Sequence, residues 1–155
     1  MKKATLLLAS IALLSACKKD SENTASKTDM LTAKNWRVSA QTTTTTINGQ
    51  TSTSSTIASC DADDFIKFNT DKTLVDDEGA TKCNSSSAQT TPGTWSFNSD
   101  ESKLTVTESG VSTTADIKEL SSSVLHLYAT QTQSQTVGGT TISYTYTTDV
   151  TYKSF

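Results

Sequence analysis

Histidine and clustered positive charge are scarce in this chain of 155 residues. His126 is its only histidine, and the sequence contains no Gly-x-Ser-x-Gly motif. Catalysis by a histidine needs a nucleophile and an orienting acid around it, and no such set stands out. The 13 basic residues are outnumbered by 16 acidic ones, and once Lys2 and Lys3 are set aside they form no cluster beyond Lys18-Lys19. Because nucleic-acid binding needs a positively charged surface, the sequence indicates neither an enzyme nor a nucleic-acid-binding protein.

Proline and long apolar stretches are also scarce. Serine and threonine make up about a third of the chain, far above ordinary usage, but Pro92 is the only proline, which argues against a mucin-like stalk. No helix of core length is expected after the N-terminal segment. Outside residues 42–46, the threonines alternate with apolar residues. Since threonine is β-branched and favours strands, this pattern predicts an all-β domain.

The N-terminus has the layout of an export signal. Two lysines precede an apolar run over residues 4–14, which is shorter than the about 20 residues that a membrane-spanning helix needs. The run ends in Leu14-Ser15-Ala16-Cys17. Small residues followed directly by cysteine match the bacterial lipobox, so residues 1–16 are predicted to be a lipoprotein signal peptide. The alternative is a plain secretory signal in which Cys17 stands by chance.

Cys17 is therefore expected to become the first residue of the mature chain and to carry a diacylglyceryl group, with fatty acids such as palmitate as the membrane anchor. The polar residues 17–29 are predicted to form a tether without a packed core. Lys18 occupies the position at which an aspartate retains some lipoproteins in the inner membrane. The expected location is the cell envelope, attached to the outer membrane by lipid, with the periplasmic or surface face left open.

Acylation of Cys17 leaves Cys60 and Cys83 as an even pair in an oxidising compartment, which predicts a disulfide. By closing a loop of about 24 residues, this disulfide would stabilise the folded state by roughly 3 kcal/mol. A pair of metal ligands is the alternative, but no histidine lies nearby to complete a zinc site. We expect neither a metal ion nor a cofactor. The acidic clusters at 61–64 and 76–78 are interpreted as solvated turn residues, with calcium binding as the alternative.

The folded domain is predicted to span residues 30–155, with one short helical turn at 30–35. Asn48-Gly49 and Gly138-Gly139 each predict a tight two-residue hairpin turn. Many short antiparallel strands favour an up-and-down barrel of eight or nine strands, and a β-sandwich is the alternative. The expected strands are 36–47, 50–58, 65–68, 73–75, 93–97, 103–107, 111–120, 124–137 and 140–152.

An eight-stranded barrel either fills with side chains or holds one small ligand. Five aromatic residues are the candidates for lining such a cavity: Trp36, Trp95, Phe97, Tyr144 and Tyr146. They could equally fill the core. On the late strand, Leu125 and Leu127 are the natural core pair, which turns His126 outward.

Short motifs in a fixed order give the domain a family resemblance. It resembles the lipocalin-like lipoproteins of the Bacteroidota over most of residues 31–152. The motifs are Leu31-Thr32-Ala33-Lys34-Asn35-Trp36, the segment from Cys60 to Thr73, Gly93-Thr94-Trp95-Ser96-Phe97 with Leu104-Thr105-Val106, and Ile117-Lys118-Glu119-Leu120 with Leu125-His126-Leu127. Lys34 replaces the glycine usual in lipocalins, and a C-terminal helix is missing. The resemblance implies a barrel and a hydrophobic-ligand role.

Two functions remain open on the sequence alone. The first is a membrane-anchored module that binds a small hydrophobic ligand inside the barrel. The second is a filled barrel without a ligand, whose polar outer face meets another protein of the cell envelope. Cavity volume depends on packing, so the sequence does not separate them.

Overall fold

The computed structural model describes residues 25–155 and shows an all-β domain with one short helix. The predicted signal peptide and Cys17 lie outside the described residues. Between residues 25 and 155, no helix has the length and apolar character needed to cross a membrane. The elements are α1 (Lys27–Thr32), β1 (Asn35–Ile47), β2 (Gln50–Ser54), β3 (Phe65–Phe68), β4 (Thr73–Asp77), β5 (Thr90–Phe97), β6 (Lys103–Glu108), β7 (Val111–Leu120), β8 (Val124–Val137) and β9 (Thr140–Ser154).

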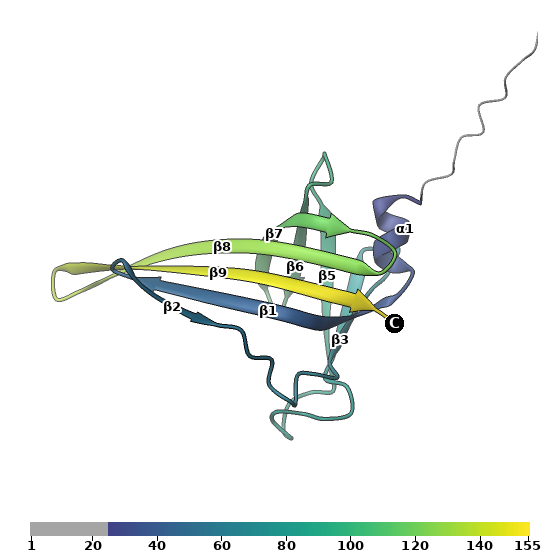
Figure 1. The fold of residues 1–155 in the computed structure, drawn as a ribbon, viewed down its shortest axis with the longest axis horizontal. Coiled ribbons are helices and arrows are strands. Elements are labelled where there is room, and N and C mark those ends of the chain that lie inside the picture. Colours follow the sequence, from purple (N-terminus) through teal and green to yellow (C-terminus); the bar gives the residue numbers. More distant parts are fainter. Residues whose placement is uncertain (1–24) are drawn as a thin grey trace, which may run out of the picture.

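The strands form one antiparallel sheet that closes on itself through β1 (Figure 1). β1 pairs with β9 from Trp36↔Ser154 to Ile47↔Tyr144, whereas it meets β3 through only two residue pairs, Asn35↔Lys67 and Trp36↔Ile66. β1 and β3–β9 make the barrel, and β2 is an additional strand on the outer half of β1. The predicted up-and-down barrel is confirmed, and the β-sandwich is excluded.

The hairpin turns and most strand bounds follow the sequence prediction. Asn48 and Gly49 both have positive φ, as do Gly138 and Gly139, which confirms the two predicted tight turns. One difference is β5, which begins at Thr90 and includes Pro92. Pro92 pairs with Val75 of β4, but pairing with β6 starts only at Gly93. Proline has no N–H to donate, and it fits at this position because residue 92 has no partner on the β6 side of the strand.

One end of the barrel is closed by aromatic side chains and by α1. We call Trp36, Phe68, Trp95 and Phe97 the aromatic base. Trp95 contacts Phe68 and Phe97 edge to face, with ring centroids 5.9 and 5.3 Å apart, and its indole N–H donates to the Asn69 carbonyl. The ammonium group of Lys72 covers the Trp95 ring at 3.7 Å. This end of the barrel is therefore filled.

The helix α1 holds the base from outside. It begins with a capping box, in which the Asp29 N–H donates to the Ser26 hydroxyl and the Ser26 N–H donates to the Asp29 carboxylate. The fully buried Leu31 accepts a 2.8 Å hydrogen bond at its carbonyl from the indole N–H of Trp36. The helix starts at Lys27 rather than within 30–35, so the last residues assigned to the 17–29 tether are ordered.

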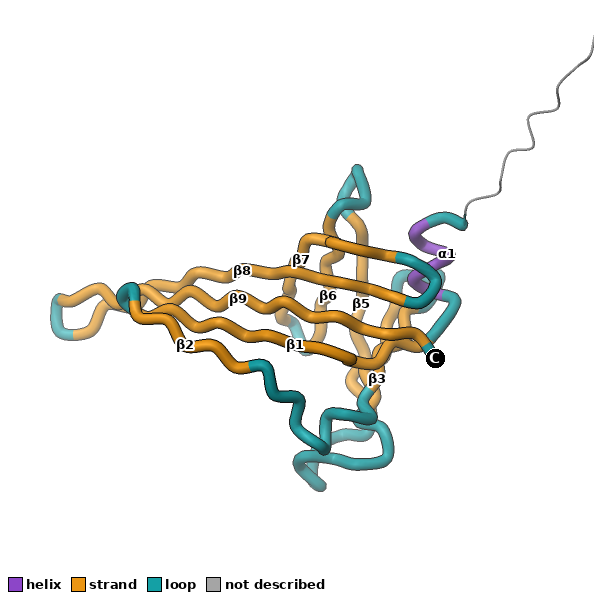
Figure 2. The backbone as a smooth tube through the Cα atoms, in the orientation of Figure 1, coloured by secondary structure: helices purple, strands orange, loops and turns teal. Residues whose placement is uncertain are grey.

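At the opposite end, four strands continue past the barrel as a twisted sheet in the order β8-β9-β1-β2 (Figures 1 and 2). We call this extension, residues 43–54 and 130–147, the arm. Its outer face carries two rows of threonines in register across all four strands, joined partly by side-chain hydrogen bonds of 3.1–3.3 Å. The rows are Thr130, Thr147, Thr44, Thr53 and Thr132, Thr145, Thr46, Thr51.

We expect Trp36→Ala to destabilise the protein by about 3–5 kcal/mol, because it removes a fully buried indole at the short pairing between β1 and β3. The matched control is Val111→Ala, whose side chain is 68% exposed and should change stability by less than about 0.5 kcal/mol. Urea unfolding followed by tryptophan fluorescence and circular dichroism measures both. If Trp36→Ala lowers the free energy of unfolding by less than about 1 kcal/mol, Trp36 does not hold the β1–β3 pairing together.

Candidate functional site

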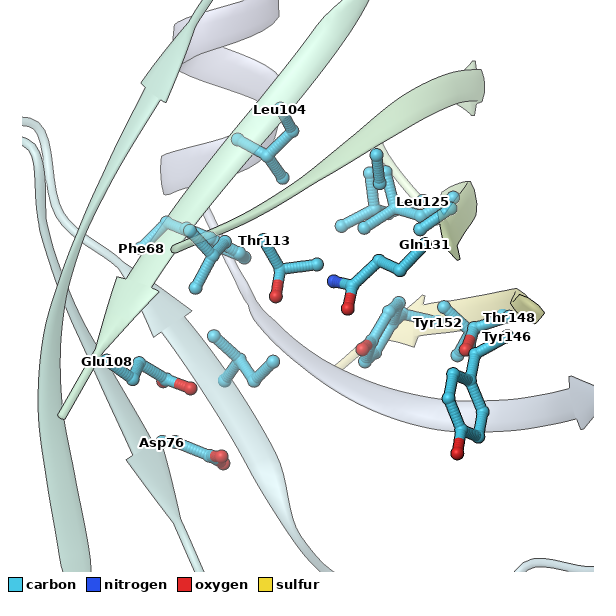
Figure 3. Close-up of a pocket in the computed structure, with 16 residues that line it drawn as sticks. Phe68, Asp76, Leu104, Glu108, Thr113, Leu125, Gln131, Tyr146, Thr148 and Tyr152 are labelled. Atoms are coloured by element: carbon cyan, nitrogen blue, oxygen red, sulfur yellow. The ribbon is translucent and has the colours of Figure 1, made fainter. Parts of the chain in front are cut away.

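A cavity of about 430 Å³ lies inside the barrel, above the aromatic base (Figure 3). It is lined by inward-facing residues of β3, β4 and β6–β9. Leu104 and Leu125, each 1% exposed, form its floor together with Phe68, Leu127 and Val150. Alternation along each strand places these apolar side chains on one face, so the floor follows from the period of the sequence.

The cavity opens where β8 and β9 leave the barrel. Gln131 and Tyr146 line this end and are exposed, with Tyr146 at 40%. Their register, Gln131↔Tyr146, continues outward as Gln133↔Tyr144 on the same face of the arm. The inner face of the arm is therefore continuous with the wall of the cavity.

Two carboxyl groups stand on the wall opposite Tyr146 and Thr148 (Figure 3): Asp76 of β4 and Glu108 of β6. Between their strands lies Gly93 of β5. A Cβ atom at Gly93 would come within 2.7 Å of the Glu108 Cγ and 3.1 Å of the Leu74 Cδ1. The missing side chain at Gly93 leaves the space in which Glu108 folds toward β4.

Both carboxyl groups are harder to ionise than usual. Burial, followed by the neighbouring charges of Glu108, Glu78 and Asp77, raises the pKa of Asp76 to about 6. Burial also raises the pKa of Glu108. These shifts mean that the folded protein holds the two ionised groups at a free-energy cost at neutral pH.

Tyr152 of β9 extends into the same cavity, with its hydroxyl on the side of the two carboxyl groups (Figure 3). Burial and then the charges of Asp76 and Glu108 raise the pKa of Tyr152 to about 12. The phenol is therefore neutral at physiological pH. It can donate or accept a hydrogen bond at the cavity wall.

The sequence prediction of the lining residues is corrected by this arrangement. Tyr146 lines the cavity as predicted, but Trp36, Trp95 and Phe97 lie outside its lining, and the two tryptophans are closely packed within the base. Tyr144 lies further out, on the arm. The error arose because alternation gives the face of the sheet on which a residue lies but not its height along the barrel axis.

Asp76 and Glu108 were not predicted as site residues. Asp76 was assigned to a solvated acidic cluster, and Glu108 stands at the end of its strand. The signal was present in the alternation, because Asp76 is two residues after the buried Leu74 and Glu108 is four after the buried Leu104. Period-2 counting therefore places both on the inner face.

The disulfide between Cys60 and Cys83 is confirmed, and it lies in the loops at the open end of the barrel. Asp63 organises the same loops: burial opposes its ionisation, but the backbone N–H groups of Ala80 and Thr81 donate to its carboxylate and hold its pKa below the usual value. In residues 25–155, the one group of potential metal ligands is Cys60, Asp61 and Cys83. Its two sulfurs are used by the disulfide.

His126 points away from the cavity, as predicted. Leu125 and Leu127 are buried on the inner face, while the His126 Nε2 lies 2.6 Å from the Asp149 Oδ1 on the outer face. This pair joins the adjacent strands β8 and β9, and neither residue lines the cavity.

Comparison with protein families identifies the domain. A family model described as a lipocalin-like domain matches residues 31–127. This range begins in α1 and ends in β8, so it contains the aromatic base, the carboxyl groups and most of the cavity floor. No curated protein matches the chain.

We expect the contribution of Asp76 to the stability of the ligand-free protein to fall as the pH rises from 4 through 6. The raised pKa of Asp76, about 6 against an ordinary 3.8, means that the folded state keeps this proton longer than the unfolded state. Its contribution is therefore present at low pH and is lost above about pH 6. Glu108 and Asp64, whose pKa values are also raised, act in the same direction.

Asp76→Asn should raise the melting temperature at pH 7.5 and reduce its decrease between pH 4.5 and 7.5. Differential scanning calorimetry at the two pH values measures this change. Glu119→Gln, on the exposed part of β7, is the control and should leave the profile as in the wild type. An Asp76→Asn profile that matches the wild type would show that this carboxyl group is not held at a cost.

Proposed function

The chain belongs to the lipocalin-like domain family, and on this premise we propose that its barrel binds a small, largely apolar ligand in the cavity between the aromatic base and the arm. The cavity of about 430 Å³, with its floor of Leu104 and Leu125, is the observation that carries this proposal. Ligand sites in proteins are typically preformed, mostly apolar and about 300–1,000 Å³ in volume. A filled barrel offers no such space.

The physical driving force is the removal of apolar surface from water. Each methylene group that a ligand buries contributes about 0.8 kcal/mol. The walls are strands of a closed sheet, so the cavity is formed before the ligand arrives. Little conformational entropy then opposes binding.

We propose a binding role rather than an enzymatic one. The lining contains two carboxyl groups, two phenols and small polar groups, but neither histidine nor cysteine. His126 faces outward beside Asp149. The site therefore offers hydrogen bonds and charge to a ligand without an activated nucleophile.

We also propose that the domain is anchored in the cell envelope, at the outer membrane, through acylated Cys17. The support is the sequence Leu14-Ser15-Ala16-Cys17 after an apolar run. The described chain begins beside α1 at the closed end of the barrel (Figure 1). A tether joined there attaches the domain by its closed end.

The anchor is tested by Cys17→Ser. We expect the wild-type protein to incorporate labelled palmitate and to sediment with membranes, and the variant to do neither. Unchanged labelling of the variant would overturn the assignment of Cys17 as the acylated residue.

Ligand binding is tested with diphenylhexatriene, an uncharged dye whose fluorescence rises in apolar surroundings. Ala129→Phe and Thr130→Phe add the same side chain to adjacent positions of β8, one in the cavity lining and one on the outer face of the arm. We expect the wild type and Thr130→Phe to bind the dye with similar affinity. Ala129→Phe should bind it at least about tenfold more weakly, because the new ring occupies the cavity.

Circular dichroism and thermal unfolding confirm that both variants fold. Equal dye binding by Ala129→Phe and Thr130→Phe would place the dye outside the barrel. Absence of binding by the wild type would favour the filled-barrel interaction protein instead.

A further inference from the structure

The charge of the cavity is one-sided. Its lining contains Asp76 and Glu108 but no lysine, arginine or histidine. In the ion pairs formed within residues 25–155, neither carboxyl group takes part. Acidic neighbours add to the field, since Glu78 and Asp77 lie close enough to Asp76 to oppose its ionisation. A site of this charge favours a cation.

A buried polar atom at this wall also lacks a partner. The Glu108 Oε1 is buried and has no hydrogen-bond partner in the described part of the chain. The Tyr152 hydroxyl lies in the same cavity, on the side of the two carboxyl groups (Figure 3). Buried polar atoms in folded proteins are normally paired, so the Glu108 Oε1 at the cavity wall is available to accept a hydrogen bond from a ligand.

Gly93 supports the same conclusion from the backbone. Any side chain at this position would meet Glu108 Cγ and the Thr107 carbonyl oxygen at 2.7 Å. The glycine thus allows a charged side chain to cross over β5 toward Asp76. An apolar residue in place of Glu108 would fill this space without burying a charge, so the fold itself does not require the carboxyl group.

We propose that the ligand is a cationic amphiphile, a primary alkyl- or arylalkylamine whose ammonium group is held by Asp76, Glu108 and Tyr152. This inference rests on the proposed function and specifies its ligand class. A primary ammonium group has three N–H donors, and the wall offers two carboxylates and one phenol oxygen to accept them. The apolar part of the ligand lies against Leu104 and Leu125.

Binding of this ligand would offset the cost of holding two buried carboxylates close together. The ammonium charge offsets the repulsion between the two carboxylates, and hydrogen bonds to charged groups are among the strongest in proteins. A fatty acid of equal length would bring a third negative charge to the same wall. A neutral alcohol would gain the apolar contacts and lose the charge interaction. The site therefore discriminates by the head group rather than by the tail.

The test compares three ten-carbon probes, 1-decylamine, 1-decanol and decanoate, by isothermal titration calorimetry at pH 7.5. We expect the wild type to bind decylamine about tenfold or more tightly than decanol, and decanoate most weakly. Asp76→Asn and Glu108→Gln should each weaken decylamine binding about tenfold or more and leave decanol binding within about threefold. Glu119→Gln is the control and should bind all three probes as the wild type does.

Retained decanol binding shows that each variant keeps its cavity. A loss of affinity for decylamine then reports the interaction with the head group alone. Equal affinity for decylamine and decanol, or decylamine binding unaffected by both substitutions, would overturn the ammonium site while the apolar cavity stands. Failure of the wild type to bind any of the three probes, together with failure to bind diphenylhexatriene, would overturn the proposed function itself.

Discussion

The structure depends on the pairing of β1 with two sides of the sheet at once. β1 meets β9 along nearly its whole length but meets β3 through only Asn35 and Trp36. Trp36 therefore lies at the narrowest point of closure, where it is fully buried and donates to the Leu31 carbonyl. Because the β1–β3 pairing is so short, β1, β2, β8 and β9 can continue beyond the barrel as the arm. Closure, the aromatic base and the open end all follow from this arrangement.

The interior combines two parts with different requirements. The base is packed for stability: its aromatic rings meet edge to face, and its indole N–H groups have carbonyl partners. The cavity above it keeps two carboxyl groups whose pKa values are raised by burial. Groups held at such a cost are typical of sites where function rather than stability determines the residue. The fold supports them because the closed sheet below is already stable.

The sequence predicted the strands well because alternation, glycine turns and short loops act locally. The even cysteine pair and the outward position of His126 were predicted for the same reason. The cavity was not predictable in the same way, since its volume depends on how far Trp36 and Trp95 fill the barrel. Asp76 was taken for a turn residue because its neighbours Asp77 and Glu78 are acidic as well. Only the pairing of β4 with β5 and of β5 with β6 shows that Gly93 brings Asp76 and Glu108 together.

A barrel that is hollow above its base holds the tail of a bound amphiphile at Leu104 and Leu125. A crystal structure of the protein with a decylamine brominated at its terminal carbon shows where this tail lies. We expect one anomalous bromine peak between Leu104 and Leu125, with the nitrogen beside Asp76, Glu108 and Tyr152. A bromine peak on the arm or on the outer surface, with the cavity floor unoccupied, would contradict it.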